Sequence, residues 1–117
     1  MSDFFTAEPS GKVTVITFQT ETLMNAHDLD QIGAEIYGLI EDGHHSQILI
    51  NFEKVMYVSS QAIGIIMAVR KKLAVIPKSR LVLCQVGPSV VQLLKITGLE
   101  KLLTIKPTTK DGLKVFE

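Results

Sequence analysis

Two short apolar segments, separated by a stretch with a helical repeat, constrain the fold of this chain more than any other feature. Residues 47–52 (QILINF) are nearly continuously apolar, which suits a strand covered on both faces, and residues 80–86 (RLVLCQV) predict another buried strand. Between them, residues 59–75 begin with two serines and end in cations before Pro77, as is typical of a helix. This order implies a right-handed crossover between parallel strands.

The remaining segments extend this alternation at both ends. Residues 12–18 are rich in β-branched side chains and predict a strand, paired with residues 4–8 as a hairpin. From Asp28 to Ile40, apolar side chains recur on one helical face. Further on, we expect a helix from Pro88-Ser89 to near Thr97-Gly98, a strand over residues 102–106 and a short helix from Thr109 or Lys110 onward. The predicted fold class is α/β, a mixed, mostly parallel sheet of about five strands packed by about four helices.

Composition indicates a single domain over residues 1–117. The chain is 46% hydrophobic and 21% charged, which is typical of globular proteins. Its one cysteine, Cys84, excludes an internal disulfide and a cysteine-based zinc site, and it should behave as a small buried hydrophobe. The first residues lack the basic region of a signal peptide, and no apolar run approaches the roughly 20 residues that span a bilayer. We therefore expect a cytoplasmic protein that does not bind membranes.

The charges of the chain are balanced in total but unevenly distributed. Twelve basic and twelve acidic side chains give a net charge of zero, which argues against a nucleic-acid partner. Residues 1–59 hold nine acidic and two basic side chains, and residues 60–117 hold three acidic and ten basic ones. This pattern is typical either of ordinary solvated surface or of a polarised docking surface.

The sequence contains no recognisable catalytic constellation. His44 and His45 stand beside a glycine in a polar turn and are interpreted as solvated surface, and His27 as a capping or exposed residue before the first long helix. No histidine has a metal-binding spacing, no glycine-rich phosphate loop occurs, and no carboxylate pair lies in an apolar stretch. The sequence therefore predicts a binding module that is not an enzyme and needs no cofactor or metal.

One junction stands out, the polar tripeptide Ser59-Ser60-Gln61 before an apolar helix. In a structural interpretation, Ser59 or Ser60 caps the helix and Gly64 lets it pack closely, so that Gly64→Leu would destabilise the fold by about 1–3 kcal/mol. In a functional interpretation, a hydroxyl at this helix N-terminus is a ligand or regulatory position that would accept a phosphate.

Three segments of the chain are similar to motifs that occur together in one family of regulatory domains. Residues 59–66 (SSQAIGII) follow a predicted strand and resemble a D-S-S-G-L-G-V-L motif. Residues 87–94 (GPSVVQLL) and 97–103 (TGLEKLL) are similar to a later helix and a T-G-L-x-K-L turn. Together and in this order, they resemble the STAS family of anti-sigma factor antagonist domains, and the similarity covers almost the whole chain.

This resemblance implies a STAS-like fold and the function of an anti-sigma factor antagonist. Such a protein would bind a cytoplasmic anti-sigma factor with serine-kinase activity, and phosphorylation of a serine would switch it. The phosphorylated serine of the family falls on Ser60. The resemblance places the partner-binding surface on Leu23, Met24, Asn25, Ser59, Ser60 and Gln61.

The chain departs from the family pattern near these positions. Ser59 stands where the family has an aspartate, Gln61 where it has a serine and Ala62 where it has a glycine. Residues 21–25 (ETLMN) replace a G-x-L-D loop. Two other functions stay open: a STAS scaffold subunit of a larger signalling complex, and a nucleotide-binding or transporter-regulatory STAS domain. The last of these is the weakest, because the sequence has neither a phosphate loop nor a membrane span.

Overall fold

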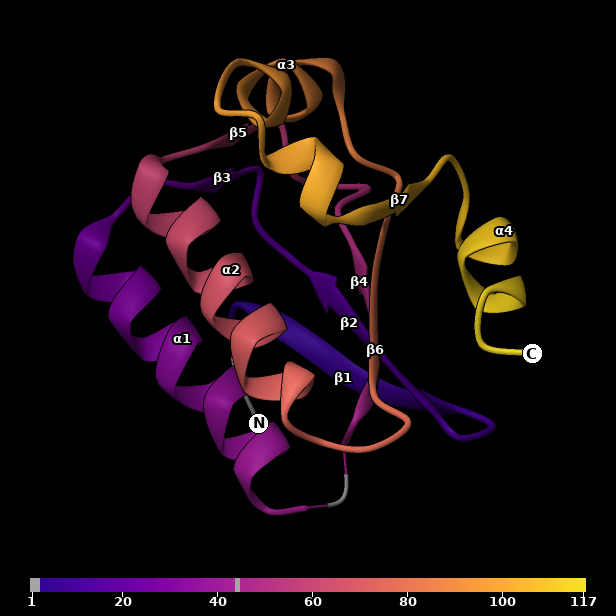
Figure 1. Cartoon of the computed structure of the whole chain (residues 1–117). Coiled ribbons are helices and arrows are strands. Elements are labelled where there is room, and N and C mark those ends of the chain that lie inside the picture. The colour runs from indigo at the N-terminus through magenta and orange to yellow at the C-terminus, as the bar shows by residue number, and fades with distance from the viewer. Residues whose placement is uncertain (1–2, 44) are drawn as a thin grey trace.

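The main sheet of the computed structural model, which describes residues 3–43 and 45–117, is mixed and mostly parallel (Figure 1). Its strands are β1 (Phe5–Ser10), β2 (Val13–Phe18), β4 (Gln47–Asn51), β6 (Arg80–Cys84) and β7 (Thr104–Lys106). They lie in the order β1-β2-β4-β6-β7, in which only the β1–β2 hairpin pairing is antiparallel. The predicted α/β fold class is confirmed.

Helices cover both faces of this sheet. Within the described residues they are α1 (Ala26–Glu41), α2 (Ser60–Ala74), α3 (Pro88–Ile96), the 3-10 helix η1 (Leu99–Leu102) and α4 (Thr109–Lys114). The helices α1 and α2 run side by side over one face, and α4 lies on the other (Figure 1). The side chains of strand β4 alternate between two apolar clusters, one on each face of the sheet. Both faces must therefore be covered by helices. Ile48 and Ile50 join the large core under α1 and α2, whereas Leu49 packs with Val82 and Phe116 near α4.

Side-chain caps fix where the two long helices begin. Helix α1 starts at Ala26, two residues before the predicted Asp28, because the Asn25 side chain accepts a hydrogen bond from the Asp28 N–H at 3.0 Å. His27 therefore lies inside the first turn, where it is exposed. Helix α2 is capped by Ser59, whose Oγ accepts from the Ala62 N–H at 3.3 Å. Of the two serines considered for this cap, Ser59 fills the position.

A small second sheet was not predicted. Its strands β3 (Thr22–Leu23) and β5 (Tyr57–Val58) are parallel, with Leu23 opposite Val58. The Ser59 N–H continues the pairing by donating to the Leu23 carbonyl at 3.0 Å. This sheet holds the segment before α1 against the segment before α2, so the starts of the two long helices lie next to each other.

The boundaries of β6 and β7 differ from the prediction for local reasons. Strand β6 ends at Cys84 because Gln85 adopts a left-handed conformation (φ 57°), which cannot continue an extended strand. Strand β7 begins at Thr104 because η1 takes up the preceding residues through Leu102.

The expected role of Gly64 is wrong. Gly64 is exposed, and a Cβ added there would have nothing within 4 Å. It stands four residues after the exposed Ser60, and residues with this spacing share one face of a helix. The close approach to the sheet occurs instead at Gly112 of α4, where an added Cβ would lie 2.8 Å from Leu49 Cδ1.

Candidate partner-binding site

The β3–β5 pairing brings the residues of the predicted partner-binding surface to one end of the molecule. Leu23, Met24 and Asn25 lie on β3 and in the link to α1, while Ser59, Ser60 and Gln61 lie at the start of α2. Because β3 and β5 are hydrogen-bonded neighbours, these two segments lie together although they are far apart in the sequence. The site therefore consists of two adjacent helix N-termini and the ribbon that joins them.

The two neighbouring serines of this site have different environments. Ser59 is half-buried, and its hydroxyl caps α2. Ser60 is the first residue of the helix, and it is exposed. The Ser60 hydroxyl is therefore open to a partner or a modifying enzyme, whereas the cap that stabilises the helix rests on Ser59. Of the two serines that could cap the helix, Ser59 therefore does so.

Two polar side chains hold the neighbouring helix starts in place. Gln61 reaches from α2 to α1, where its Nε2 donates to Asp30 Oδ1 at 2.8 Å and to the Ala26 carbonyl at 3.4 Å. Asn25 is exposed and caps α1. Both residues therefore position the site in addition to contributing polar surface to it.

Leu23 does not belong to the exposed surface. Its side chain is only 4% exposed and lies in the core with residues of α1 and α2. Its backbone carbonyl is occupied by the Ser59 N–H. The predicted contact between the Leu23 side chain and a partner is therefore corrected: Leu23 anchors the ribbon.

The sequence did not predict two exposed hydrophobic residues of this site. Met56 is 54% exposed and Tyr57 is 53% exposed, similar to the 55% of the predicted contact residue Met24. The β3–β5 register explains part of this exposure, because Leu23 and Val58 face inward and the alternate positions face outward. The available signal was a pair of large apolar residues directly before Ser59. Met24, Met56 and Tyr57 are called the apolar patch below.

Three acidic residues, Glu21, Asp28 and Asp30, lie close to the apolar patch along the chain. Asp30 bonds to Gln61, the Asp28 N–H bonds to Asn25, and the Glu21 carbonyl accepts from the N–H groups of Met56 and Tyr57. By contrast, the first turn of α2 carries no acidic side chain. The positive end of the α2 dipole therefore has one acidic side chain, that of Asp30, linked to its first turn through Gln61.

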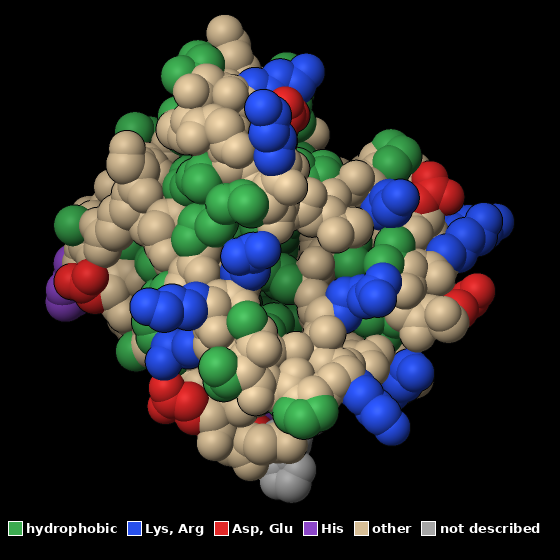
Figure 2. All heavy atoms as spheres, in the orientation of Figure 1, with side chains coloured by type: hydrophobic (Ala, Val, Ile, Leu, Met, Phe, Trp, Pro, Cys, Tyr) green, Lys and Arg blue, Asp and Glu red, His purple; other side chains and the backbone are tan. Residues whose placement is uncertain are grey.

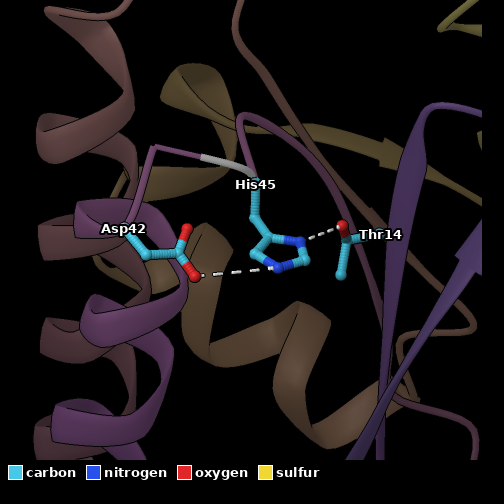
Figure 3. Close-up of polar contacts among 3 residues, drawn as sticks. All are labelled: Thr14, Asp42 and His45. Carbon is cyan, nitrogen blue, oxygen red and sulfur yellow. Dashed lines mark hydrogen bonds and ion pairs between the residues drawn. The ribbon is translucent and has the colours of Figure 1, made fainter.

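The expected solvated surface at the histidine turn is wrong for His45. This residue is half-buried, and its Nδ1 and Thr14 Oγ1 form a hydrogen bond of 2.7 Å (Figure 3). On the other side, Asp42 Oδ2 lies 4.0 Å from His45 Nε2 (Figure 3). His45 therefore ties the end of α1 to β2, away from the apolar patch. The corresponding expectation for His44 lies outside the described residues.

The buried position of Cys84 is confirmed. The residue has no exposed surface, and burial raises the pKa of its thiol, against a smaller lowering from the Thr109 hydroxyl at 3.5 Å. In the part of the chain that the structure describes, no group of three or more His, Cys, Asp and Glu side chains could hold a metal ion. No helix among these residues is long and apolar enough to cross a bilayer.

Comparison with known proteins identifies the family of the chain. The family model of the STAS domain matches residues 5–112, which includes the sheet, the apolar patch and both serines. The chain belongs to the STAS domain family. A search of curated proteins gives no significant match.

Solved structures share the fold of this STAS domain over nearly its whole length. The anti-sigma factor antagonist SpoIIAA in its unphosphorylated form is 24% identical, with a TM-score of 0.79 over 93% of this chain and 92% of that one. The Bacillus cell fate determinant SpoIIAA in its phosphorylated form is 22% identical, with a TM-score of 0.74 over 97% of this chain and 99% of that one.

A third structure is that of an anti-sigma-factor antagonist (STAS) domain protein from Planctomyces limnophilus. It is 22% identical, with a TM-score of 0.85 over 97% of each chain. At this level of identity the structural likeness shows the fold. The STAS-like architecture expected from the sequence motifs is therefore confirmed.

Proposed function

We propose that this STAS domain is an anti-sigma factor antagonist, a regulatory binding module and not a catalyst. Residues 1–117 would act as one domain in the cytoplasm, bind an anti-sigma factor with serine-kinase activity and so release a sigma factor. The observation that carries the proposal is the exposed Ser60 at the start of α2, with the capping function left to Ser59. The similarity to SpoIIAA, solved in unphosphorylated and phosphorylated forms, supports it.

The environment of Ser60 is compatible with a switch by phosphorylation. A phosphate there adds about −1.5 to −2 charges near the positive end of the α2 dipole, where the fold itself can accept them. The same charge would stand at the end of the β3–β5 ribbon, which carries the exposed Met24 and Tyr57. A partner surface that packs against these apolar side chains would have to desolvate the phosphate, which costs several kcal/mol unless a cation lies opposite. Phosphorylation would therefore release the partner without unfolding the domain.

The departures from the family pattern do not remove the features that this switch needs. Ser59 replaces the aspartate of the family motif, and serine is as good an N-cap residue as aspartate. Gln61 replaces a serine, and it links α2 to α1 through Asp30. The helix start is therefore well ordered, and Ser60 is held at a fixed, exposed position.

The proposal is tested by incubating the protein with the anti-sigma factor and ATP and mapping the modified residue by mass spectrometry. We expect the phosphate on Ser60, none on Ser59, and no incorporation into Ser60→Ala. Binding measured by isothermal titration calorimetry should weaken at least about tenfold for Ser60→Asp, while Ser60→Ala binds like the wild type. A phosphate on Ser59, or equal binding by Ser60→Asp, would contradict the switch.

A further inference from the structure

A groove lies between the C-terminal half of α2 and the segments η1, β6 and β7. Its volume is about 280 Å³. Arg70 of α2 and Arg80 of β6 line it together with Leu102 and Leu103, and none of its lining residues is acidic or aromatic. Figure 2 shows this face, on which a hollow with an apolar interior opens among basic side chains. The groove combines leucine side chains with polar and basic residues.

Backbone carbonyl groups hold both arginines in place. Arg70 Nε donates to the Leu102 carbonyl at 2.8 Å, and Arg80 Nη1 donates to the Val115 carbonyl at 3.2 Å. Each guanidinium has five N–H donors, so most of its donors remain available. Among the described residues, the ion pairs are Lys72–Glu41 and the His45–Asp42 contact, and neither involves these arginines. The two guanidinium groups are thus positioned but not neutralised.

The surroundings of the groove reinforce its positive charge. Lys71, Lys78 and Lys101 stand next to lining residues in the sequence, and all three are exposed. The acidic residues on the neighbouring segments are Glu41, Glu100, Asp111 and Glu117, and none lies within ion-pair distance of an arginine. A concave surface lined by one sign of charge concentrates ions of the opposite sign. The groove is therefore complementary to an anion.

We propose that this groove is a second docking surface of the domain, and that its occupant is an acidic peptide segment of a partner protein. A carboxylate of the segment would pair with the free N–H groups of Arg70, whose fork geometry matches it, while Arg80, whose side chain turns toward Val115 on the α4 side of β6, adds positive charge at the edge of the groove. An apolar side chain of the segment would pack on Leu102, which is 49% exposed.

The groove chemistry favours a peptide over a nucleic acid or a nucleotide. Binding of single-stranded nucleic acid relies on aromatic side chains that stack on bases, and none lines the groove. The leucine side chains offer no comparable stacking surface. They do offer a site for an aliphatic side chain, which an acidic peptide carries and a phosphate backbone lacks.

This second surface is spatially separate from the proposed anti-sigma factor site. Arg70 follows Ser60 by ten residues along α2, which corresponds to about 15 Å at 1.5 Å per residue. The domain could then hold two partners at once, one at each end of the helix. The inference does not depend on the Ser60 switch, because loss of anti-sigma factor binding would leave peptide binding in the groove unchanged.

The test uses fluorescence anisotropy with a fluorescein-labelled decapeptide of glutamates around one central leucine. We expect saturable binding by the wild type that weakens at least about fivefold between about 50 and 300 mM NaCl. The peptide with glutamine in place of glutamate should not bind. No saturable binding, or equal binding of the glutamine peptide, would overturn the proposal.

Variants locate the peptide on the protein. The double change Arg70→Glu and Arg80→Glu should weaken binding at least about tenfold, and the milder Arg70→Gln should weaken it in the same direction while keeping a donor for the Leu102 carbonyl. Lys12→Glu, in the β1–β2 turn at the opposite edge of the sheet, makes a matched charge change and should alter affinity less than about twofold. An equal effect of Lys12→Glu would overturn the assignment to the groove. Two further results would overturn this assignment. One is that a single-stranded oligonucleotide binds the groove more tightly than the peptide does, and the other is that the protein self-associates and the peptide does not dissociate the complex.

Discussion

The two ends of α2 present opposite chemistry to solvent. At its N-terminal end, Ser60 is exposed beside the apolar patch, and Asp28 and Asp30 of α1 stand nearby. At its C-terminal end, Arg70 borders a groove that no acidic side chain lines. The helix dipole stabilises this placement of charges, since a helix N-terminus favours anions and a C-terminus favours cations. One helix can therefore serve two partners of different charge, because its ends face different surroundings.

The largest expected effect concerns the apolar patch at the N-terminal end. Changing Met24 and Tyr57 together to serine should weaken binding of the anti-sigma factor about 30-fold or more, because exposed aromatic and Met side chains dominate interface energies. Isothermal titration calorimetry measures the change. The matched control is Val75→Ser at the other end of α2, where the valine is 83% exposed. Equal weakening by Val75→Ser would show that the two ends do not differ as described.

A second prediction separates the two serines by stability. Ser59→Ala should lower the free energy of unfolding by about 1 kcal/mol, because the Ala62 N–H loses its acceptor. Ser60→Ala should change it by less than about 0.5 kcal/mol, since Ser60 is exposed and alanine is a better helix former. Urea unfolding followed by circular dichroism compares the two variants. A larger loss of unfolding free energy for Ser60→Ala than for Ser59→Ala would show that Ser60, and not Ser59, caps the helix.

The same region shows which features of the structure the sequence could predict. The alternation of strands and helices and the burial of β4 follow from the sequence pattern, because Ile48, Leu49 and Ile50 can all be buried only in a strand covered on both faces. The location of Ser60 at a helix start follows from the polar residues before an apolar helix. These features depend on patterns that are local in the sequence, and the structure confirms them.

The surface around Ser60 could not be predicted in the same way. Strands β3 and β5 have two residues each, too few for an alternation pattern, and each is defined only by its distant partner. For that reason the burial of Leu23 and the exposure of Met56 and Tyr57 could not be read from the sequence. Gly64 is a different case, because its spacing of four residues from Ser60 already indicated the exposed face of α2.

A third prediction uses Gly64, which lies one turn into α2 from the serines. Gly64→Ala should raise the free energy of unfolding by about 0.5–1 kcal/mol, because the new Cβ meets nothing within 4 Å and glycine is a poor helix former. The same change at Gly112 is the comparison, since its Cβ would lie 2.8 Å from Leu49 Cδ1 and should destabilise the domain. The urea midpoints of the two variants measure these effects. Destabilisation by Gly64→Ala would show that an added Cβ at this position clashes with a neighbouring residue.

The smallest expected effect concerns the C-terminal end, where one cation of α2 is already paired. Lys72 Nζ lies 2.9 Å from Glu41 Oε1 and 5.0 Å from the centre of the Tyr37 ring. Because the Lys72 and Glu41 side chains are 36% and 62% exposed, Lys72→Gln should lower the free energy of unfolding by only about 0.5 kcal/mol. Lys71→Gln, at the exposed neighbouring position, should change it less.

A double-mutant cycle with Glu41→Gln isolates the ion pair between the two helices. The coupling should be about 0.3–0.5 kcal/mol at low salt and should shrink in about 300 mM NaCl, as expected of a partly exposed pair. Lys72 packs toward α1 and does not line the groove of Arg70. Lys72→Gln should therefore leave binding of the acidic peptide nearly unchanged, whereas Arg70→Gln weakens it. Equal weakening of peptide binding by both changes would show that the peptide responds to the net positive charge of this end of α2. The two ends of the helix would then differ in net charge alone, and the groove would not be a specific site.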